Sequence, residues 1–264
     1  MTPPRCLSIA TSDSGGGAGI QADLKAFAAA RCHGMTAIVG VTAQDTESIL
    51  AVHQLPTWVI TAQLEAVWSD IGVDAAKTGA LLSAEVIVAV ADFLVSHPTT
   101  LVIDPVLRAS SGAVLLDPDA VEVLITRLLP LATVVTPNLV EARVLAGADG
   151  DRRTLAEAIA ARGARAVLIT GGDGGGSDLL FDCVDHVEIP IAWVEGSATH
   201  GTGCTHSATL AAELAWGTPL LDAARRAAEV TAAAIRDGLP GIGAGPGPVA
   251  VGQASGVSQR VRTR

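Results

Sequence analysis

The chain has 264 residues, of which 49% are hydrophobic, and its mean hydropathy is +0.45. It can therefore bury a sizeable core, and single α/β domains of this length are common. Aromatic residues make up only 3% and tyrosine is absent, which argues against a β-sandwich and against a base-stacking surface. The formal net charge of −10 also argues against nucleic acid as a partner, so an anionic substrate would need local binding groups such as helix N-termini or a metal ion.

The cysteine pattern bears on compartment and on metal binding. The four cysteines form no CxxC pair and are far apart in the sequence: Cys6, Cys32, Cys183 and Cys204. Together with the absence of a secretory leader, this spacing argues against a disulfide framework or a zinc site, and we expect a cytoplasmic protein. No apolar run reaches the length of a membrane span, so we expect no membrane partner.

Short apolar runs alternate with amphipathic segments along the chain. The first run, Arg5 to Ala10, precedes a glycine-rich loop and a helix in which Ile20, Leu24 and Phe27 recur at helical spacing. The other predicted strands are 35–43, 75–78, 101–104, 133–136, 166–170, 179–181 and 186–190. The other predicted helices are 57–71, 83–97, 117–129, 139–145, 155–162, 203–216 and 219–237. This order predicts an α/β fold with a mainly parallel sheet, to which 179–181 and 186–190 add antiparallel strands.

Polar or glycine-rich segments follow most of the predicted strands. These segments are 12–19, 42–45, 77–79, 104–105, 136–141 and 170–176. Since ligands of parallel sheets bind beyond the carboxyl ends of the strands, we expect one site there. The segment 239–264 is rich in Gly and Pro and then basic, and we predict that it is a flexible tail on a domain spanning 1–238.

The sharpest candidate for chemistry is the segment 199–205, THGTGCT, which opens an alanine-rich helix. A glycine-spaced helix N-terminus leaves backbone N–H groups unpaired, and the helix dipole adds positive potential, as a transferring phosphoryl group requires. Because Cys204 falls in the first turn, we expect the dipole to lower its thiol pKa. The alternative interpretation is an ordinary helix start with a small buried cysteine.

The glycine-rich segment 12–19, after the first strand, is the second candidate. It lacks the GK[ST] of a P-loop, and its glycine spacing does not match GxGxxG. A tight strand-to-helix turn is an equally good interpretation.

Several single polar residues lie near predicted strand ends. Asn138 and Glu141 are spaced i, i+3 at a helix start, so both can point one way, where a carboxylate would suit magnesium or would simply cap the helix. Asp104 ends a buried strand, where a carboxylate has few structural reasons to be. Taken singly, Asp23 and Gln44 are more simply explained as capping or solvated residues.

Together and in this order, these segments resemble the hydroxymethylpyrimidine and hydroxymethylpyrimidine-phosphate kinases of thiamin biosynthesis, in the ribokinase-like superfamily. The similarity extends from about Cys6 to Gly238. It is carried by residues 12–13 (SD), 16–25 (GGAGIQADLK), 42–46 (TAQDT), 77–79 (KTG), 104–106 (DPV), 136–138 (TPN) and 200–205 (HGTGCT). The resemblance implies a three-layer α/β/α fold and ATP- and Mg²⁺-dependent phosphorylation of 4-amino-5-hydroxymethyl-2-methylpyrimidine phosphate. The free alcohol is a second candidate substrate, and a homodimer is the implied assembly.

The resemblance also implies roles for the substrate-binding and catalytic residues. Asp23 and Gln44 would hydrogen-bond the pyrimidine edge, in a substrate site that includes Thr11 and Gly19. The anion hole would be formed by four catalytic residues: Gly201, Thr202, Gly203 and Cys204. The cysteine occupies the position of the catalytic aspartate of sugar kinases, and a substrate phosphate, already nucleophilic at neutral pH, would need no strong base.

For ATP and its metal the resemblance implies a second group of residues. Asn138, Thr170 and Thr199 would contact ATP. Asp104 and Glu141 would position Mg²⁺.

The chain departs from the family pattern at several positions. Gly, Pro and Ser of the family are replaced by Thr11, Ser14 and Gly15, two methionines by Ala80 and Leu107, two lysines by Ser111 and Thr170, and an asparagine by Ala198. The missing methionines alter the pocket lining, and the change at Thr170 removes a cation that would face the nucleotide phosphates. Two alternatives therefore stay open: a pyridoxal-type kinase of the same fold, and a catalytically weakened paralogue that binds pyrimidine or nucleotide.

Overall fold

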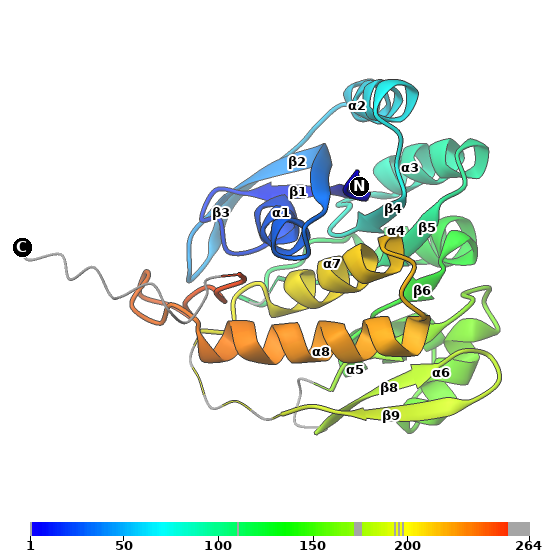
Figure 1. The fold of residues 1–264 in the computed structure, drawn as a ribbon. Helices are drawn as coiled ribbons and strands as arrows, with labels where there is room; N and C mark the ends of the chain where they lie inside the picture. Colours follow the sequence, from blue (N-terminus) through cyan, green and yellow to red (C-terminus); the bar gives the residue numbers. More distant parts are fainter. Residues whose placement is uncertain are drawn as a thin grey trace, which may run out of the picture.

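The computed structural model describes residues 2–109, 111–171, 176–192, 194, 196 and 198–252. One nine-stranded sheet runs through these residues in the order β3-β2-β1-β4-β5-β6-β7-β8-β9 and has helices on both faces (Figure 1). The central strands are parallel: β2 (His33–Gln44), β1 (Arg5–Asp13), β4 (Ala75–Thr78), β5 (Thr100–Ile103), β6 (Val134–Val135) and β7 (Val167–Ile169). The mainly parallel sheet is the one that the sequence predicts.

Three antiparallel strands complete the sheet: β3 (Ile49–Gln54) at one edge, and β8 (Ser177–Phe181) followed by the edge strand β9 (His186–Pro190) at the other. The pair β8 and β9 was expected, whereas β3 was not. The Asp45 side chain makes the turn before β3, because its carboxylate accepts the backbone N–H groups of Glu47 and Ser48 at 2.9 and 2.8 Å. The chain after β2 therefore folds back as a hairpin.

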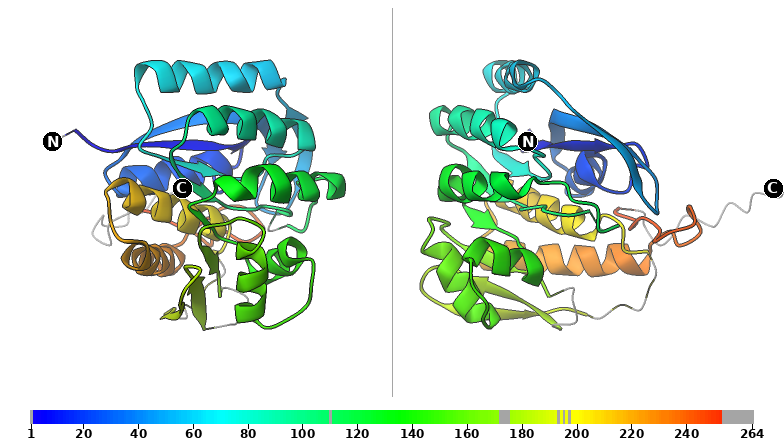
Figure 2. Two further views of the ribbon diagram at one scale, coloured as in Figure 1. Left: turned by 90° about the vertical axis from the view of Figure 1, so that its right-hand side faces the viewer. Right: turned by 180° about the vertical axis from the view of Figure 1, so that it is seen from behind.

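The helices form two layers, which the left-hand view of Figure 2 shows on opposite sides of the sheet. One layer contains α1 (Gly19–Ala29), α7 (Thr202–Ala215) and α8 (Leu220–Arg236). The other contains α2 (Thr57–Asp70), α3 (Ala84–Ser96), α4 (Pro118–Val123) with its short continuations η1 (Leu124–Leu128) and η2 (Leu129–Leu131), α5 (Leu139–Ala146) and α6 (Arg152–Ala160). Within the part of the chain that is described, no helix combines the length and apolar character that crossing a membrane requires.

Successive residues of the buried strands separate into two cores, one beneath each helical layer. On β5, Leu101 and Ile103 pack towards α3, whereas Val102 packs towards α7 and α8. This alternation is the side-chain period of a strand, and burial on both faces explains why the strand sequences are apolar throughout.

Two helix starts follow from their capping residues. Asn138 and Glu141 form a reciprocal capping box at α5, with the Glu141 N–H donated to Asn138 Oδ1 at 2.9 Å and the Asn138 N–H donated to Glu141 Oε2 at 3.0 Å. Asp151 accepts the Thr154 N–H at 2.8 Å, so α6 begins at Arg152 and not at the predicted residue 155.

The predicted boundary between the domain and a flexible tail at residue 238 is wrong, because the chain beyond it remains packed on the domain. Val249 and Ala250 are each only 5% exposed, and the Val249 N–H is donated to the His200 carbonyl oxygen at 3.1 Å. The His200 N–H is donated in turn to the Gly247 carbonyl oxygen at 3.1 Å. Residues 239–252 therefore belong to the folded unit, and 253–264 lie outside the described residues.

Candidate active site

A cavity of about 470 Å³ opens at the carboxyl ends of the parallel strands. These strand ends lie on the left of Figure 1. The cavity walls come from the ends of β1, β2 and β4–β7 and from the first turns of α5 and α7. Every site residue predicted from the sequence lines this cavity except Asp23: Thr11, Gly19, Gln44, Asp104, Asn138, Glu141, Thr170, Thr199, Gly201, Thr202, Gly203 and Cys204. Segments that are distant in the sequence therefore meet at the carboxyl ends of the strands, as expected for a parallel sheet.

The amino end of α7 presents free backbone donors to this cavity. Gly201 is the N-cap in the left-handed conformation, with φ of 85°, and its carbonyl accepts the Thr205 N–H at 2.9 Å. The Thr202 N–H and hydroxyl are both donated to the Thr199 carbonyl, at 3.2 and 2.7 Å. Among the described residues, the N–H groups of Gly203 and Cys204 have no backbone acceptor. Together with the helix dipole, backbone donors of this kind are able to bind an anion.

Asp13 holds the glycine-rich loop that faces α7. Its carboxylate accepts the N–H groups of Gly15, Gly17 and Ala18 at 2.8, 3.0 and 2.8 Å, and His200 Nε2 lies 3.1 Å from Oδ2. Burial opposes the charge on Asp13, but the hydrogen bonds from His200, Ala18 and Gly15 outweigh it and hold the pKa of the carboxyl below its usual value. The loop and the start of α7 are thus joined through one ionised carboxylate.

Two glycines are required where these segments touch. A Cβ at Gly201 would overlap the carbonyl oxygen of Gly17, and a Cβ at Gly19, whose φ is +55°, would overlap the carbonyl oxygen of Thr11. Both positions also have a positive φ that other residues rarely adopt. Glycine therefore allows the close approach that shapes the cavity wall.

Cys204 does not have the lowered pKa that its place in the first turn of α7 predicts. Burial raises the pKa of this thiol to about 12, although Lys77 and the N–H of Gly19 favour the thiolate. The expectation of an activated thiolate is wrong, because burial, together with the carboxylates of Asp23 and Asp104, outweighs Lys77 and the Gly19 N–H. At neutral pH the side chain is a thiol.

Asp23 is also placed differently from the prediction. Its carboxylate is fully buried, accepts Ser8 Oγ–H at 2.5 Å and pairs with Lys77 Nζ at 2.9 and 3.1 Å. It does not line the cavity, so its hydrogen bond to the pyrimidine edge stays a prediction that the geometry does not support. Burial opposes the charge of Lys77, but the carboxylates of Asp23 and Asp104 hold the pKa of this lysine above its usual range. The pair lies beneath the cavity floor as a buried ion pair.

Asp104 extends this buried network to the cavity surface. Its Oδ2 accepts Ser207 Oγ–H at 2.9 Å and lies 3.5 Å from Lys77 Nζ. Ser207 belongs to α7, so the carboxylate that ends β5 is tied both to the helix bearing the anion-binding position and to the buried lysine.

The donor set of the cavity fits magnesium only with help from substrate and water. Asp104 and Glu141 supply carboxylate oxygens, as Mg²⁺ prefers, but Glu141 already accepts the N–H groups of Asn138 and Leu107 at 3.0 and 3.4 Å. The described residues contain no group of three or more His, Cys, Asp or Glu side chains able to hold a metal. Mg²⁺ usually binds to one or two carboxylates together with substrate phosphates and waters, which suits these two residues.

Gln44 ends β2 at the side of the cavity bounded by the glycine-rich loop. Its backbone N–H is donated to Ser14 Oγ at 2.8 Å, and its Oε1 accepts Thr42 Oγ1–H at 3.1 Å. Thr170 lies on another wall, where its N–H is donated to the Pro137 carbonyl at 2.9 Å. Residues 172–175, which follow it in the predicted segment 170–176, lie outside the described residues.

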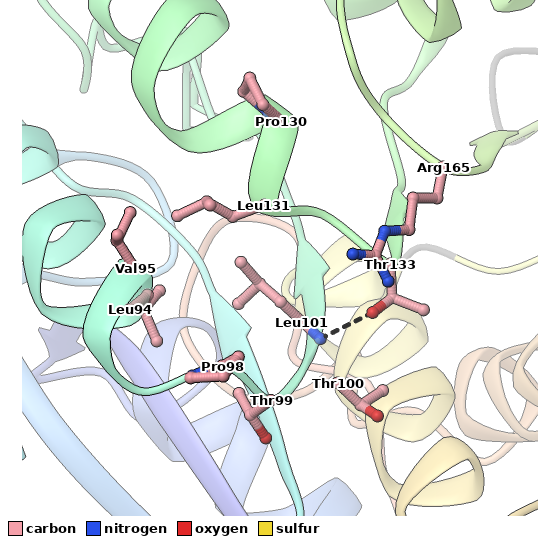
Figure 3. A pocket seen from close by; sticks show the side chains of 10 residues that line it. All are labelled: Leu94, Val95, Pro98, Thr99, Thr100, Leu101, Pro130, Leu131, Thr133 and Arg165. Atoms are coloured by element: carbon pink, nitrogen blue, oxygen red, sulfur yellow. Dashed lines mark hydrogen bonds between the residues drawn. The ribbon is translucent and has the colours of Figure 1, made fainter.

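A second cavity, of about 510 Å³, lies at the opposite ends of the strands, near the amino ends of β5 and β6 (Figure 3). Leu94, Val95 and Pro98 line one side of it and Leu131 another, with the Arg165 side chain at its rim. None of the predicted site residues lines it, so the chemistry suggested by the sequence belongs to the first cavity.

Two cavity features were not assigned roles from the sequence. In the sequence, Asp13 is visible only as part of a motif. The three backbone hydrogen bonds that its carboxylate accepts exist only once the glycine-rich loop is folded. His206 belongs to none of the motifs identified in the sequence, yet it lines the cavity and its Nε2 lies 3.1 Å from Asp178 Oδ2. Nothing in the sequence predicts that a residue of β8 contacts a residue of α7.

Comparisons with known proteins decide the family. The model of the phosphomethylpyrimidine kinase family matches residues 13–250. The chain belongs to this family. It is 48% identical to the hydroxymethylpyrimidine/phosphomethylpyrimidine kinase of Rhizobium meliloti, over 92% of this chain and 95% of that protein. The resemblance seen in the sequence motifs is therefore confirmed, and the chain is a kinase.

Solved structures confirm the fold. The pyridoxal kinase of Bacillus subtilis, solved with ADP, superposes with a TM-score of 0.87 at 37% identity. The superposition covers 95% of this chain and 98% of that one. The phosphomethylpyrimidine kinase of Clostridium difficile superposes with a TM-score of 0.76 at 36% identity, over 86% of this chain and 96% of that one. The predicted ribokinase-like α/β/α fold is thus confirmed, and such structures in complex with ADP support the use of ATP.

Proposed function

We propose that this kinase transfers the γ-phosphoryl group of ATP to 4-amino-5-hydroxymethyl-2-methylpyrimidine phosphate, and also to the free alcohol. The observation that carries the proposal is the cavity itself. It combines the unpaired N–H groups of Gly203 and Cys204 with the amide of Gln44 and the carboxylates of Asp104 and Glu141. Donors aimed at a developing negative charge are the main need of phosphoryl transfer.

We assign the pyrimidine to the side of the cavity formed by Thr11, Gly19 and Gln44. The Gln44 amide has both a donor and an acceptor and can pair with the edge of an aminopyrimidine. Asp23 takes no part in this contact, since its carboxylate is buried on Lys77.

ATP is assigned to the opposite walls, where Asn138, Thr170 and Thr199 line the cavity. The γ-phosphoryl group then lies between the two ligands, at the segment Gly201 to Cys204. Mg²⁺ would be held by Asp104 and Glu141 together with the nucleotide phosphates, and when bound it would neutralise part of the phosphate charge.

The chemistry follows from the ionisation states. The phosphate of the pyrimidine substrate has a second pKa of about 6, so at neutral pH its oxygen attacks without a base. The free alcohol must lose a proton, and the nearby acceptor candidate Cys204 is a thiol with a pKa of about 12. Phosphorylation of the phosphate should therefore be the faster of the two reactions at neutral pH.

For the assembly we propose a homodimer that covers the hairpin of β2 and β3. Leu50 and Val52 lie two residues apart on β3, so they share a face, and they are 76% and 46% exposed. Sedimentation of the native chain beside a Leu50→Asp variant tests this: a dimer that becomes a monomer agrees, and a native monomer contradicts it.

A coupled ADP-release assay tests the substrate assignment with three acceptors: the pyrimidine alcohol, its phosphate and pyridoxal. Turnover with the pyrimidines is the expected result. Pyridoxal is included because the structurally similar Bacillus subtilis protein is a pyridoxal kinase. Turnover with pyridoxal alone, or tight pyrimidine binding without ADP release, would overturn the proposal in favour of one of the two alternatives.

A further inference from the structure

His206 and Asp178 form a buried pair at the wall of the cavity that we assign to ATP. His206 lies on the second turn of α7 and is 5% exposed, and Asp178 on β8 is 1% exposed. His206 Nε2 lies 3.1 Å from Asp178 Oδ2, and because an ionised carboxylate only accepts, Nε2 carries the hydrogen. Asp178 thus fixes both the orientation of the ring and its tautomer.

The other oxygen of Asp178 holds the backbone that follows β7. Oδ1 accepts the Gly171 N–H at 2.8 Å. At Gly171 the chain passes so close to β8 that an added Cβ would overlap the carbonyl oxygen of Ser177. One carboxylate therefore ties the wall containing Thr170 to the helix whose first turn binds the phosphoryl group.

Packing alone does not account for an imidazole at this position. His206 Nδ1 is buried and has no hydrogen-bond partner among the described residues, which is a cost that an aliphatic side chain of similar size would avoid. The buried polar residues that follow on α7, Ser207 and Thr209, each donate their hydroxyl to a carbonyl oxygen of their own helix, which an imidazole at His206 does not do. What an aliphatic residue would lack is the hydrogen bond to Asp178.

The scarcity of positive charge in the cavity also indicates that the position of its backbone donors matters. Among the described residues that line it, only Arg108, His200 and His206 have side chains that can carry positive charge. His200 is engaged with Asp13 in the glycine-rich loop, and Arg108 donates to the Gly112 carbonyl at 3.2 Å. A wall that must receive the nucleotide phosphates with so few cations depends on correctly placed backbone donors.

We propose that His206 and Asp178 are a positioning pair for the nucleotide phosphates. This inference rests on the kinase function proposed above. Through Asp178, the His206 imidazole keeps the backbone at Gly171 and the amino end of α7 at the spacing that the phosphates of ATP require. The pair acts on nucleotide binding and not on the pyrimidine side of the cavity.

Three substitutions of one residue test the pair. The side-chain nitrogen of His206→Gln can take the place of Nε2 and still donate to Asp178, whereas His206→Asn is too short to do so and His206→Leu has no donor. The measurements are the ADP dissociation constant by titration calorimetry, the KM for ATP and for the pyrimidine phosphate, and the midpoint of thermal unfolding. Comparing the two amide variants separates the hydrogen bond from general packing.

His186 provides a matched control in the same chain. Its Nε2 lies 2.9 Å from Glu157 Oε1, and its Nδ1 is also buried without a partner in the described part of the chain. Its ring, however, stacks on Phe181 outside the cavity. His186→Leu therefore removes a similar pair without touching the nucleotide wall. It should leave the ADP dissociation constant and both KM values unchanged.

We expect His206→Leu and His206→Asn to weaken ADP binding and raise the KM for ATP about tenfold, the size of one charge-assisted hydrogen bond. The KM for the pyrimidine phosphate should stay within about twofold, and His206→Gln should restore most of the loss. Equal ADP affinity in all variants, or a Gln variant as weak as the Leu variant, would overturn the proposal. A native enzyme that releases no ADP with the pyrimidine phosphate would instead refute the proposed function, and the ADP titrations would still decide the role of the pair.

Discussion

The buried thiol of Cys204 predicts different pH dependences for the two substrates. With a pKa of about 12, only about 10⁻⁵ of this side chain is thiolate at pH 7, and the fraction rises tenfold with each pH unit. If the thiolate accepts the proton of the alcohol, kcat/KM for the alcohol should rise about tenfold per unit between pH 7 and 9. The pyrimidine phosphate is already ionised in this range, so its kcat/KM should be nearly constant.

Cys204→Ser removes the titrating group while keeping a small polar side chain at the start of α7. In this variant the slope for the alcohol should disappear, whereas kcat/KM for the phosphate should change less than about threefold. The assay is coupled ADP release for both substrates across the pH series, with the phosphate reaction serving as the internal control. The same slope in the variant, or equal losses on both substrates at every pH, would refute the assignment of Cys204 as proton acceptor.

Three further substitutions follow from the geometry. Lys77→Met leaves the buried Asp23 carboxylate unpaired, so the free energy of unfolding in a denaturant titration should fall by about 3–5 kcal/mol, and a loss below about 1 kcal/mol would contradict a buried ion pair. The pKa of Asp13 lies below its usual 3.8, so the carboxylate stabilises the fold above this pH and loses its effect as the pH falls through the folded-state value. Asp13→Asn should therefore flatten the acid side of the thermal stability profile, and an unchanged profile would contradict this. Gly201→Ala should lower kcat at least tenfold, because its Cβ would overlap the glycine-rich loop. The control is Gly217→Ala, at a similar φ with open space around it, which should leave kcat unchanged. Equal effects of the two substitutions would show that backbone strain alone is responsible.

The core of the fold could be predicted because burial on both faces of the strands leaves a strong apolar signal. β3 could not, since Leu50 and Val52 on this edge strand are exposed and the turn before it depends on the Asp45 side chain. The segment 239–252 was mistaken for a tail because its composition is that of a loop. Its order comes from backbone hydrogen bonds to His200, which composition does not reveal.

At the site, the sequence predicted which segments meet but not how each side chain is used. Asp23 lies three residues after Ile20 and four before Phe27, so the helical period that predicts α1 also places it on the buried face. Cys204 has the position of an activated thiol, but its raised pKa depends on the packing of α7 against α1 and β4, which the sequence does not reveal. The pairing of His206 with Asp178 likewise exists only once β8 lies beside α7.

The central claim is that the free N–H groups at the start of α7 stabilise the phosphoryl group in transfer. A crystal structure of the enzyme with the pyrimidine phosphate, ADP, Mg²⁺ and aluminium fluoride tests it most directly. The account predicts fluoride atoms at about 2.7–3.1 Å from the backbone nitrogens of Gly203 and Cys204, with Gln44 on the pyrimidine. An analogue bound away from α7, with both N–H groups facing water, would contradict the account.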